Sequence, residues 1–171
     1  MNLRSLAAAI LLALVACTSG ASGGSSSSAD LDAWKTDARE PYPFTTPIPD
    51  REATAIDGLY RREVSFEEVP MAAPCRRCPP YRIYPGGATL EFTEGRFHIA
   101  DEESVFGSSG HYRVDGDELT LFNDLVCPAL EVTYEWTVED GVLTLDIPHD
   151  PCAFDNLRGR YLTKYAWPVA E

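Results

Sequence analysis

The sequence is short of basic residues. It contains 14 lysines and arginines against 27 aspartates and glutamates, which gives a formal net charge of −13. A surface this acidic repels nucleic acid and anionic lipid head groups. We therefore expect no nucleic-acid partner, and we interpret most of the carboxylates as solvated surface charge.

The sequence also lacks an apolar run long enough to cross a bilayer as a helix. The apolar run Leu6–Ala16 has eleven residues, whereas a transmembrane helix needs roughly 20. The run follows the basic residue Arg4 and ends in small residues, as secretory signals do. We predict that residues 1–16 are an export signal.

The residues at the end of this run, Leu14-Val15-Ala16-Cys17, resemble the lipobox of bacterial lipoproteins. The resemblance implies cleavage just before Cys17 and a diacylglyceryl thioether on its sulfur. The protein is then lipid-anchored to a bacterial membrane and faces outside the cytoplasm. The alternative is an ordinary secretory signal that is cut near Ala21. Cleavage before Cys17 leaves 155 residues (171 − 16), which is the size of one domain.

Long helical patterns are missing as well, and a pattern of strand, tight turn and strand occurs twice instead, at residues 112–121 and 136–145. Asp115-Gly116 and Asp140-Gly141 supply residues that tolerate the positive φ of a tight hairpin turn. Apolar and polar residues alternate around both turns, as in strands with one buried face. The apolar positions are Tyr112, Val114, Leu119, Leu121, Val132, Tyr134, Trp136 and Val138.

Similar alternation begins at Gly58, where the first strand of the domain is expected. Its predicted inward residues are Tyr60, Arg62, Val64 and Phe66. We expect Arg62 either to pair with a carboxylate or to lie at an open end, because an unpaired buried charge is costly. Further predicted strands occupy residues 81–84, 88–93, 96–100 and 160–167, with a loop or irregular edge strand at 101–109 and one helical turn within 150–159.

About eight closely spaced strands with tight turns predict an all-β fold, an antiparallel meander closing into a barrel. An eight-stranded barrel is either filled by its own side chains or holds one small ligand. The chain after the export signal divides into three segments, of which the last is the barrel. They are a Ser/Gly-rich tether at 17–29, a Pro-rich arm at 30–56 that packs on the barrel through Trp34, Tyr42, Phe44 and Ile48, and the barrel itself at 57–167.

Several segments resemble the lipocalin-like, or calycin, domains of bacterial extracellular proteins. They are Gly58-Leu59-Tyr60, residues 110–117, residues 134–138, Asp150-Pro151-Cys152 and residues 158–162. Lipocalins open with Gly-x-Trp and pack a late arginine across that tryptophan. Here Tyr60 stands in the tryptophan position, and Arg158 or Arg160 is the candidate arginine. The resemblance implies a barrel that takes a small apolar ligand, although a shared fold is weak evidence for a shared function.

Four cysteines follow Cys17, and in an exported domain they favour two disulfides, for which three pairings are possible. We predict Cys127 with Cys152, which joins the ends of the second hairpin, and Cys75 with Cys78. The first pair closes a loop of 24 intervening residues, worth about 3 kcal/mol. Cys75-Arg76-Arg77-Cys78 also has the spacing of a redox dithiol, with arginines that would lower a thiol pKa. It does not start a helix as thioredoxin-like motifs do, so a structural disulfide is preferred and metal binding is a further alternative.

The remaining motifs give no catalytic centre. His98, His111 and His149 lack ligand spacing, and we expect His98 and His111 to be solvated. Residues 101–103 are acidic but lack the pattern of a calcium loop, and no Gly-x-Ser-x-Gly is present. We predict no catalytic residues, metal site or cofactor, and therefore a protein that is not an enzyme.

The aromatic residues of the strands are the remaining candidates for a site. If the barrel is hollow, these side chains and Arg62 line a mostly apolar cavity with a few polar groups, as is usual for small ligands. If it is filled, they form the core. The candidate lining residues are Tyr60, Arg62, Phe92, Phe97, Tyr112, Tyr134 and Trp136. The expected function is an anchored binding module for a small hydrophobic or amphipathic ligand. The alternatives are a structural or protein-interaction domain and an envelope redox protein.

Overall fold

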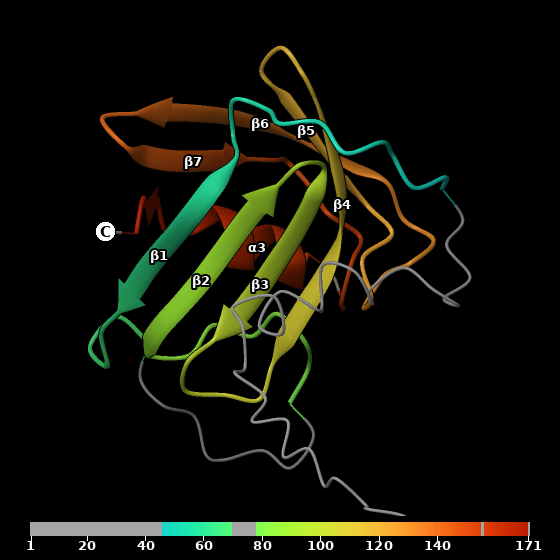
Figure 1. Ribbon diagram of the computed structural model, residues 1–171. Coiled ribbons are helices and arrows are strands. Elements are labelled where there is room, and N and C mark those ends of the chain that lie inside the picture. The colour runs from blue at the N-terminus through green and yellow to red at the C-terminus, as the bar shows by residue number, and fades with distance from the viewer. Residues whose placement is uncertain (1–45, 70–77, 155, 171) are drawn as a thin grey trace, which may run out of the picture.

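The computed structural model describes residues 46–69, 78–154 and 156–170. They form one eight-stranded antiparallel sheet in which every strand pairs with its neighbours in the sequence, so the all-β meander is confirmed (Figure 1). The strands are β1 (Gly58–Val64), β2 (Gly86–Thr93), β3 (Arg96–Asp101), β4 (Gly107–Asp115), β5 (Glu118–Phe122), β6 (Val132–Glu139), β7 (Val142–Asp146) and β8 (Trp167–Pro168). One helix, α3 (Leu157–Thr163), precedes β8.

The first and last strands meet, which curls the sheet into a nearly closed barrel. Tyr60 forms an antiparallel bridge with Val169, and the backbone N–H of Ala170 donates to the carbonyl of Leu59 at 2.8 Å. β8 has two residues, so the seam is shorter than the other strand pairings.

The second predicted hairpin turn has positive φ at both of its named residues, whereas in the first only Gly116 does and Asp115 ends β4. Asp140 and Gly141 have φ of 51° and 75°, and Gly116 has φ of 62°. The turn between β2 and β3 is built the same way, with Glu94 at 46° and Gly95 at 79°. Positive φ in these residues matches the twist of the strands on either side and so fixes the strand register.

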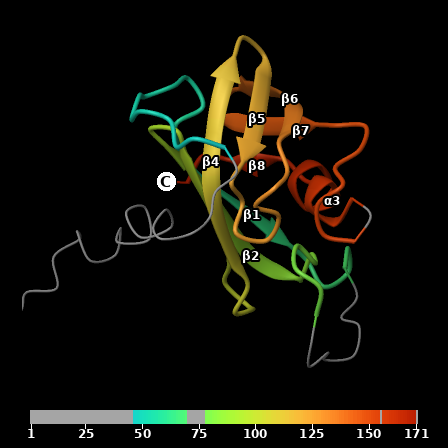
Figure 2. The same ribbon diagram turned by 90° about the vertical axis from the view of Figure 1, so that its right-hand side faces the viewer.

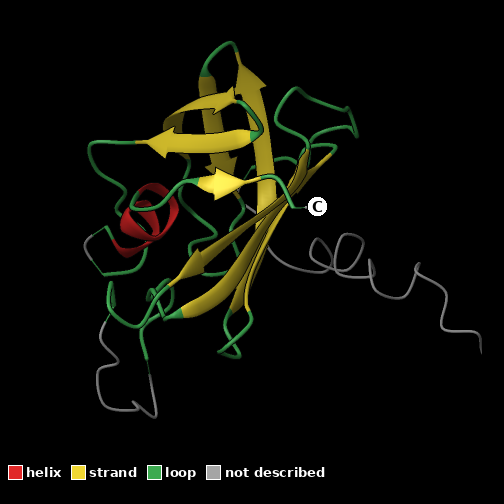
Figure 3. Cartoon of the chain, turned by 90° about the vertical axis from the view of Figure 1, so that its left-hand side faces the viewer, coloured by secondary structure: helices red, strands yellow, loops and turns green. Residues whose placement is uncertain are grey.

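The last predicted strand, at residues 160–167, is largely wrong. Residues 157–163 form α3, whose side chains at Arg158, Tyr161 and Leu162 are buried on one face. The buried residues of this segment have the i, i+3, i+4 spacing of a helix face, and such a short apolar pattern can also be read as the alternation of a strand. α3 lies next to β7 and β8 (Figures 2 and 3).

The predicted strand at residues 81–84 is also wrong, since these residues form a turn and an irregular segment. Pro79, Pro80 and Pro85 flank the segment and cannot donate to a strand ladder.

The predicted inward position of Phe66 is also wrong: its side chain is 64% exposed, because β1 ends at Val64. Residues 101–109, predicted as a loop or irregular edge strand, are a loop only between β3 and β4, since β4 begins at Gly107 and pairs on both sides.

The described end of the arm packs against the barrel. Ile56 is fully buried in the hydrophobic core. Asn123 and the backbone of Thr46 exchange two hydrogen bonds, at 3.2 and 2.8 Å. Of the four predicted arm contacts, Ile48 is half-buried, and Trp34, Tyr42 and Phe44 lie outside the described residues, as do the signal, the tether and Cys17.

Candidate functional site

Five of the seven candidate lining residues belong to a tightly filled interior. Tyr60, Phe92, Phe97, Tyr112 and Tyr134 are at most 2% exposed and lie in one core cluster. Neighbouring rings touch edge to face, with centroids 6.4 Å apart for Tyr60 and Phe92 and 4.9 Å apart for Phe92 and Tyr112. At these positions the barrel is filled by its own side chains, and we interpret the five residues as core.

The tyrosine hydroxyls in this core are bonded to other protein groups. Tyr60 donates to the carbonyl of Ile56 at 2.9 Å. Tyr112 donates to Asp57, and Tyr134 donates to Asp150. Burial raises the pKa of all three phenols, so each stays a neutral donor. These hydroxyls stabilise the fold, and a ligand would have to break existing hydrogen bonds to use them.

Arg62 is on the inner side of β1, as predicted, but it neither lies at an open end nor forms a salt bridge within the described residues. Its guanidinium carbon lies 4.2 Å from the ring centroid of Tyr161 and 4.1 Å from that of Trp167, and it donates to the backbone carbonyl of Tyr161. Burial lowers the pKa of Arg62, an effect that Tyr161 and Asp101 partly oppose. Contact with two aromatic rings replaces the expected carboxylate partner.

This contact reverses the expected arrangement of an early aromatic residue and a late arginine. An arginine of the first strand packs on a tryptophan of the last strand, while the predicted late arginine, Arg158, binds carboxylates elsewhere in the core. Arg160 is exposed.

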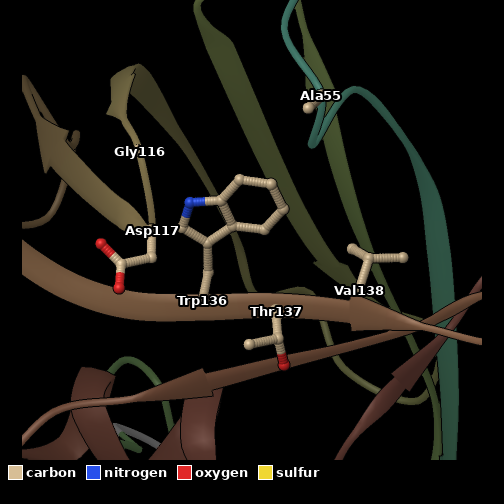
Figure 4. Close-up of a pocket in the computed structure, with 6 residues that line it drawn as sticks. All are labelled: Ala55, Gly116, Asp117, Trp136, Thr137 and Val138. Carbon is tan, nitrogen blue, oxygen red and sulfur yellow. The ribbon is translucent and has the colours of Figure 1, made fainter.

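Trp136, unlike the five core residues, lines an open pocket in the described part of the chain. The pocket has a volume of about 420 Å³ and is lined by Ala55, Gly116, Asp117, Trp136, Thr137 and Val138. It lies between the β4–β5 turn, β6 and the arm, and the indole stands within it with its nitrogen edge toward Asp117 (Figure 4). By alternation along β6, Trp136 shares the inward face of Val132 and Tyr134. The pocket is therefore at one end of the barrel.

Local hydrogen bonds hold the tryptophan in place. The backbone N–H of Trp136 donates to the carbonyl of Asp117 at 2.9 Å, which ties β6 to the β4–β5 turn. Nε1 of the indole is buried and has no hydrogen-bond partner among the described residues. The accessible part of this side chain is therefore carbon, and the site offers aromatic surface instead of a hydrogen-bond donor.

Sequence reasoning missed a buried ionic cluster beside this core. Arg158 lies 2.8 Å from Asp124 and 2.7 Å from Asp150, and all three side chains are fully buried. Tyr81 also donates to Asp124, and Ser108 donates to it at 2.7 Å. Although burial opposes its charge, Tyr134 and the carboxylates raise the pKa of Arg158. Every polar group of the cluster is used internally, so we interpret it as structural.

The cysteines contain the signal that could have revealed this cluster. Cys127 and Cys152 form the predicted disulfide, with their Cα atoms 5.8 Å apart. Asp124 is three residues before Cys127, and Asp150 is two residues before Cys152. The disulfide therefore brings both carboxylates close together, where a buried cation is needed to balance their charge. Cys75 lies outside the described residues, and the pairing of Cys75 with Cys78 stays a prediction.

The histidines and acidic residues form no metal centre in the described part of the chain. The expectation that His111 is solvated is wrong, because it is 2% exposed and stacks on Phe122 with the ring centroids 6.0 Å apart. The side chain of Asn123, which is bonded to Thr46 of the arm, lies 3.4 Å from Nδ1 of His111.

The acidic residues 101–103 bind other protein groups at two of their three positions. Asp101 accepts a hydrogen bond from Tyr161, and Glu102 pairs with Arg61 at 2.8 Å.

Comparisons of the chain with protein-family models, with curated proteins and with solved structures gave no match. The resemblance to lipocalin-like domains therefore stays a prediction based on the residues quoted above. Within the described ranges, no helix has both the length and the apolar character that crossing a bilayer requires.

Proposed function

We propose that this protein is a non-enzymatic binding module of the bacterial cell envelope that holds a small amphipathic ligand at one end of its barrel. The observation that carries the proposal is the open pocket of about 420 Å³ around Trp136, which falls within the usual size range of small-molecule sites. Buried side chains of one hydrophobic cluster occupy the core, and we place the ligand at the barrel end.

The position of the pocket suits a preformed site. Trp136 pairs with Leu145 of β7, and its backbone N–H is bonded to the β4–β5 turn. A site held by paired strands needs little ordering when a ligand binds, which preserves affinity. Carbon surface from Trp136, Val138 and Ala55 supplies the apolar part of the contact, and Asp117 adds an acidic residue to the lining.

Attachment to the membrane is the second part of the proposal, and it is supported by the sequence around Cys17. The lipid on Cys17 anchors the chain outside the cytoplasm, and the Ser/Gly tether lets the barrel stand away from the surface. Mass spectrometry of the membrane fraction tests this part. The expected result is a chain that begins at a diacylated Cys17, and an unlipidated soluble chain would contradict it.

Binding is tested by native mass spectrometry of the full mature protein purified from its own host. We expect a bound small molecule on the wild-type protein and loss of that molecule in Trp136→Ala. Phe66→Ala is the matched control, because Phe66 is an exposed aromatic residue far from the pocket in sequence. Retention of the molecule by Trp136→Ala, or its loss in both variants, would contradict binding at this pocket.

A structural or protein-interaction domain is the second candidate function. The filled aromatic interior favours it, because a packed barrel provides rigidity without a deep ligand cavity. Cross-linking in intact cells distinguishes the two functions. A specific protein partner, together with the absence of any retained small molecule, would favour the interaction domain.

A further inference from the structure

Two hairpin turns next to the Trp136 pocket carry only negative charge. The β4–β5 turn contributes Gly116 and Asp117 to the pocket lining, and the β6–β7 turn follows Val138, which also lines the pocket. Residues 115–118 and 139–141 contain no lysine, arginine or histidine. Their carboxylates are all exposed and belong to Asp115, Asp117, Glu118, Glu139 and Asp140.

Two arginines of the adjoining segments form ion pairs with glutamates. Arg113 of β4 pairs with Glu131 at 3.0 Å, and Arg51 of the arm lies 3.6 Å from Glu94. Neither arginine belongs to the pocket lining. The electrostatic potential at the rim is therefore negative, and the overall charge of −13 adds to it.

The floor of the pocket complements a cation in a second way. Because Nε1 of Trp136 is buried on the Asp117 side of the ring (Figure 4), the indole presents carbon surface to the pocket. The face of an indole attracts positively charged groups through its quadrupole, and tryptophan is the strongest of the aromatic residues in this respect. Val138 and Ala55 offer apolar surface beside it.

From this combination we infer that the ligand of the Trp136 pocket is a small organic cation, with an ammonium group on a short apolar body. The inference rests on the proposed function and specifies its ligand class. The ammonium group lies against the indole and near the carboxylate of Asp117, and the apolar body contacts Val138 and Ala55. A pocket of about 420 Å³ accommodates one such molecule.

Isothermal titration of the full mature protein with three probes of equal chain length tests the inference. The probes are hexyltrimethylammonium, neutral hexanol and anionic hexanoate. We expect hexyltrimethylammonium to bind at least about ten-fold more tightly than hexanol, from its attraction to the aromatic ring and the acidic rim. Hexanoate should bind most weakly, and added salt should weaken the binding of the ammonium probe alone.

Two variants and one control locate the effect. Asp117→Asn keeps the shape of an exposed side chain and should weaken ammonium binding about three-fold while leaving hexanol binding unchanged. Trp136→Leu should weaken ammonium binding more than ten-fold. Asp146→Asn, which removes an exposed carboxylate outside the pocket lining, should leave all binding unchanged. If Trp136→Leu fails to fold, the Asp117→Asn comparison still decides the question.

The possible results separate this inference from the function on which it rests. Equal binding of hexanol and the ammonium probe, unaffected by Asp117→Asn, would overturn the cationic ligand and leave a binding module in place. Tighter binding of a lysine-rich peptide than of the ammonium probe, abolished by Trp136→Leu, would overturn the small-molecule assignment. Failure of all three probes, with no ligand retained from the host, would overturn both proposals.

Discussion

Arg158 holds Asp150 through two hydrogen bonds, from Nε to Oδ2 at 2.7 Å and from Nη2 to Oδ1 at 3.2 Å. The same guanidinium donates to Asp124 at 2.8 Å. Asp124 follows β5, Asp150 follows β7 and Arg158 lies on α3. One buried cation therefore joins α3 to the segments that follow β5 and β7, and its removal leaves two carboxylates without a positive partner among the described residues.

The first prediction is that Arg158→Met destabilises the protein by about 3–5 kcal/mol, because breaking a buried charge network leaves uncompensated charge in the core. Urea unfolding followed by circular dichroism measures the loss. Arg160→Met is the matched control, since Arg160 lies two residues away on the same helix and is exposed. A loss below about 1 kcal/mol for Arg158→Met would contradict the structural role of the cluster.

The second prediction concerns coupling between the disulfide and this cluster. Replacing Cys127 and Cys152 by alanine should cost about 3 kcal/mol, from the 25-residue separation that the disulfide closes. The backbone N–H of Cys152 donates to Asp150 at 2.8 Å; alanine keeps this donor, but loss of the disulfide releases the chain that positions it, so this change and Arg158→Met both disturb the same carboxylate. Their combined effect should differ from the sum of the separate effects by at least about 0.5 kcal/mol. Simple additivity in a double-mutant cycle would show that the two features are independent.

The third prediction is that lysine is a poor replacement for Arg62. The planar guanidinium lies over the rings of both Tyr161 and Trp167, and a lysine ammonium cannot cover both rings in the same way. We expect Arg62→Lys to cost about 2 kcal/mol and Arg62→Met to cost less, because methionine fills the space without burying a charge. Thermal unfolding measures both.

Arg61→Met is the control for this comparison. Arg61 is the next residue of β1, but it faces outward and pairs with Glu102 at the surface, so its replacement should leave the thermal midpoint nearly unchanged. A lysine variant as stable as wild type would show that the aromatic contacts of Arg62 are unimportant.

The fourth prediction is a pH-dependent contribution from Asp57. Burial opposes ionisation of this carboxyl, but hydrogen bonds from Glu94, Tyr112 and Thr54 outweigh burial and lower its pKa from 3.8. Two of these bonds measure 2.9 Å from the Glu94 N–H and 2.7 Å from Thr54. Asp57→Asn should cost about 1–2 kcal/mol at neutral pH, because it removes a charged acceptor.

The lowered pKa fixes the direction of the pH effect. The contribution of Asp57 is fully present above its unfolded pKa near 3.8 and is lost as the pH falls through the folded value. Urea unfolding at pH 6 and at pH 3 should therefore show a smaller difference between wild type and Asp57→Asn at the lower pH. A difference that grows on acidification would contradict a carboxylate at this position.

The sequence predicted the inward direction of Trp136 but not the pocket that this residue lines. Alternation along β6 places Trp136 on the inward face together with Tyr134, but Tyr134 is fully buried and Trp136 lines a pocket. The pattern of one strand does not indicate where the barrel ends. That depends on the length of the neighbouring hairpins and on the arm, which brings Ala55 to the same pocket.

The sequence by itself determined the all-β meander and most of its strands, because period-two alternation and residues that tolerate positive φ are local properties of the chain. It also indicated the disulfide between Cys127 and Cys152, through the even number of cysteines and the hairpin that separates them. Only the tertiary structure decided that the barrel is filled, that residues 157–163 are a helix, and that Arg158 neutralises two carboxylates. These features depend on contacts between segments that are not adjacent in the sequence. The free energy of such contacts depends on how the side chains pack, and the local sequence pattern does not specify that packing.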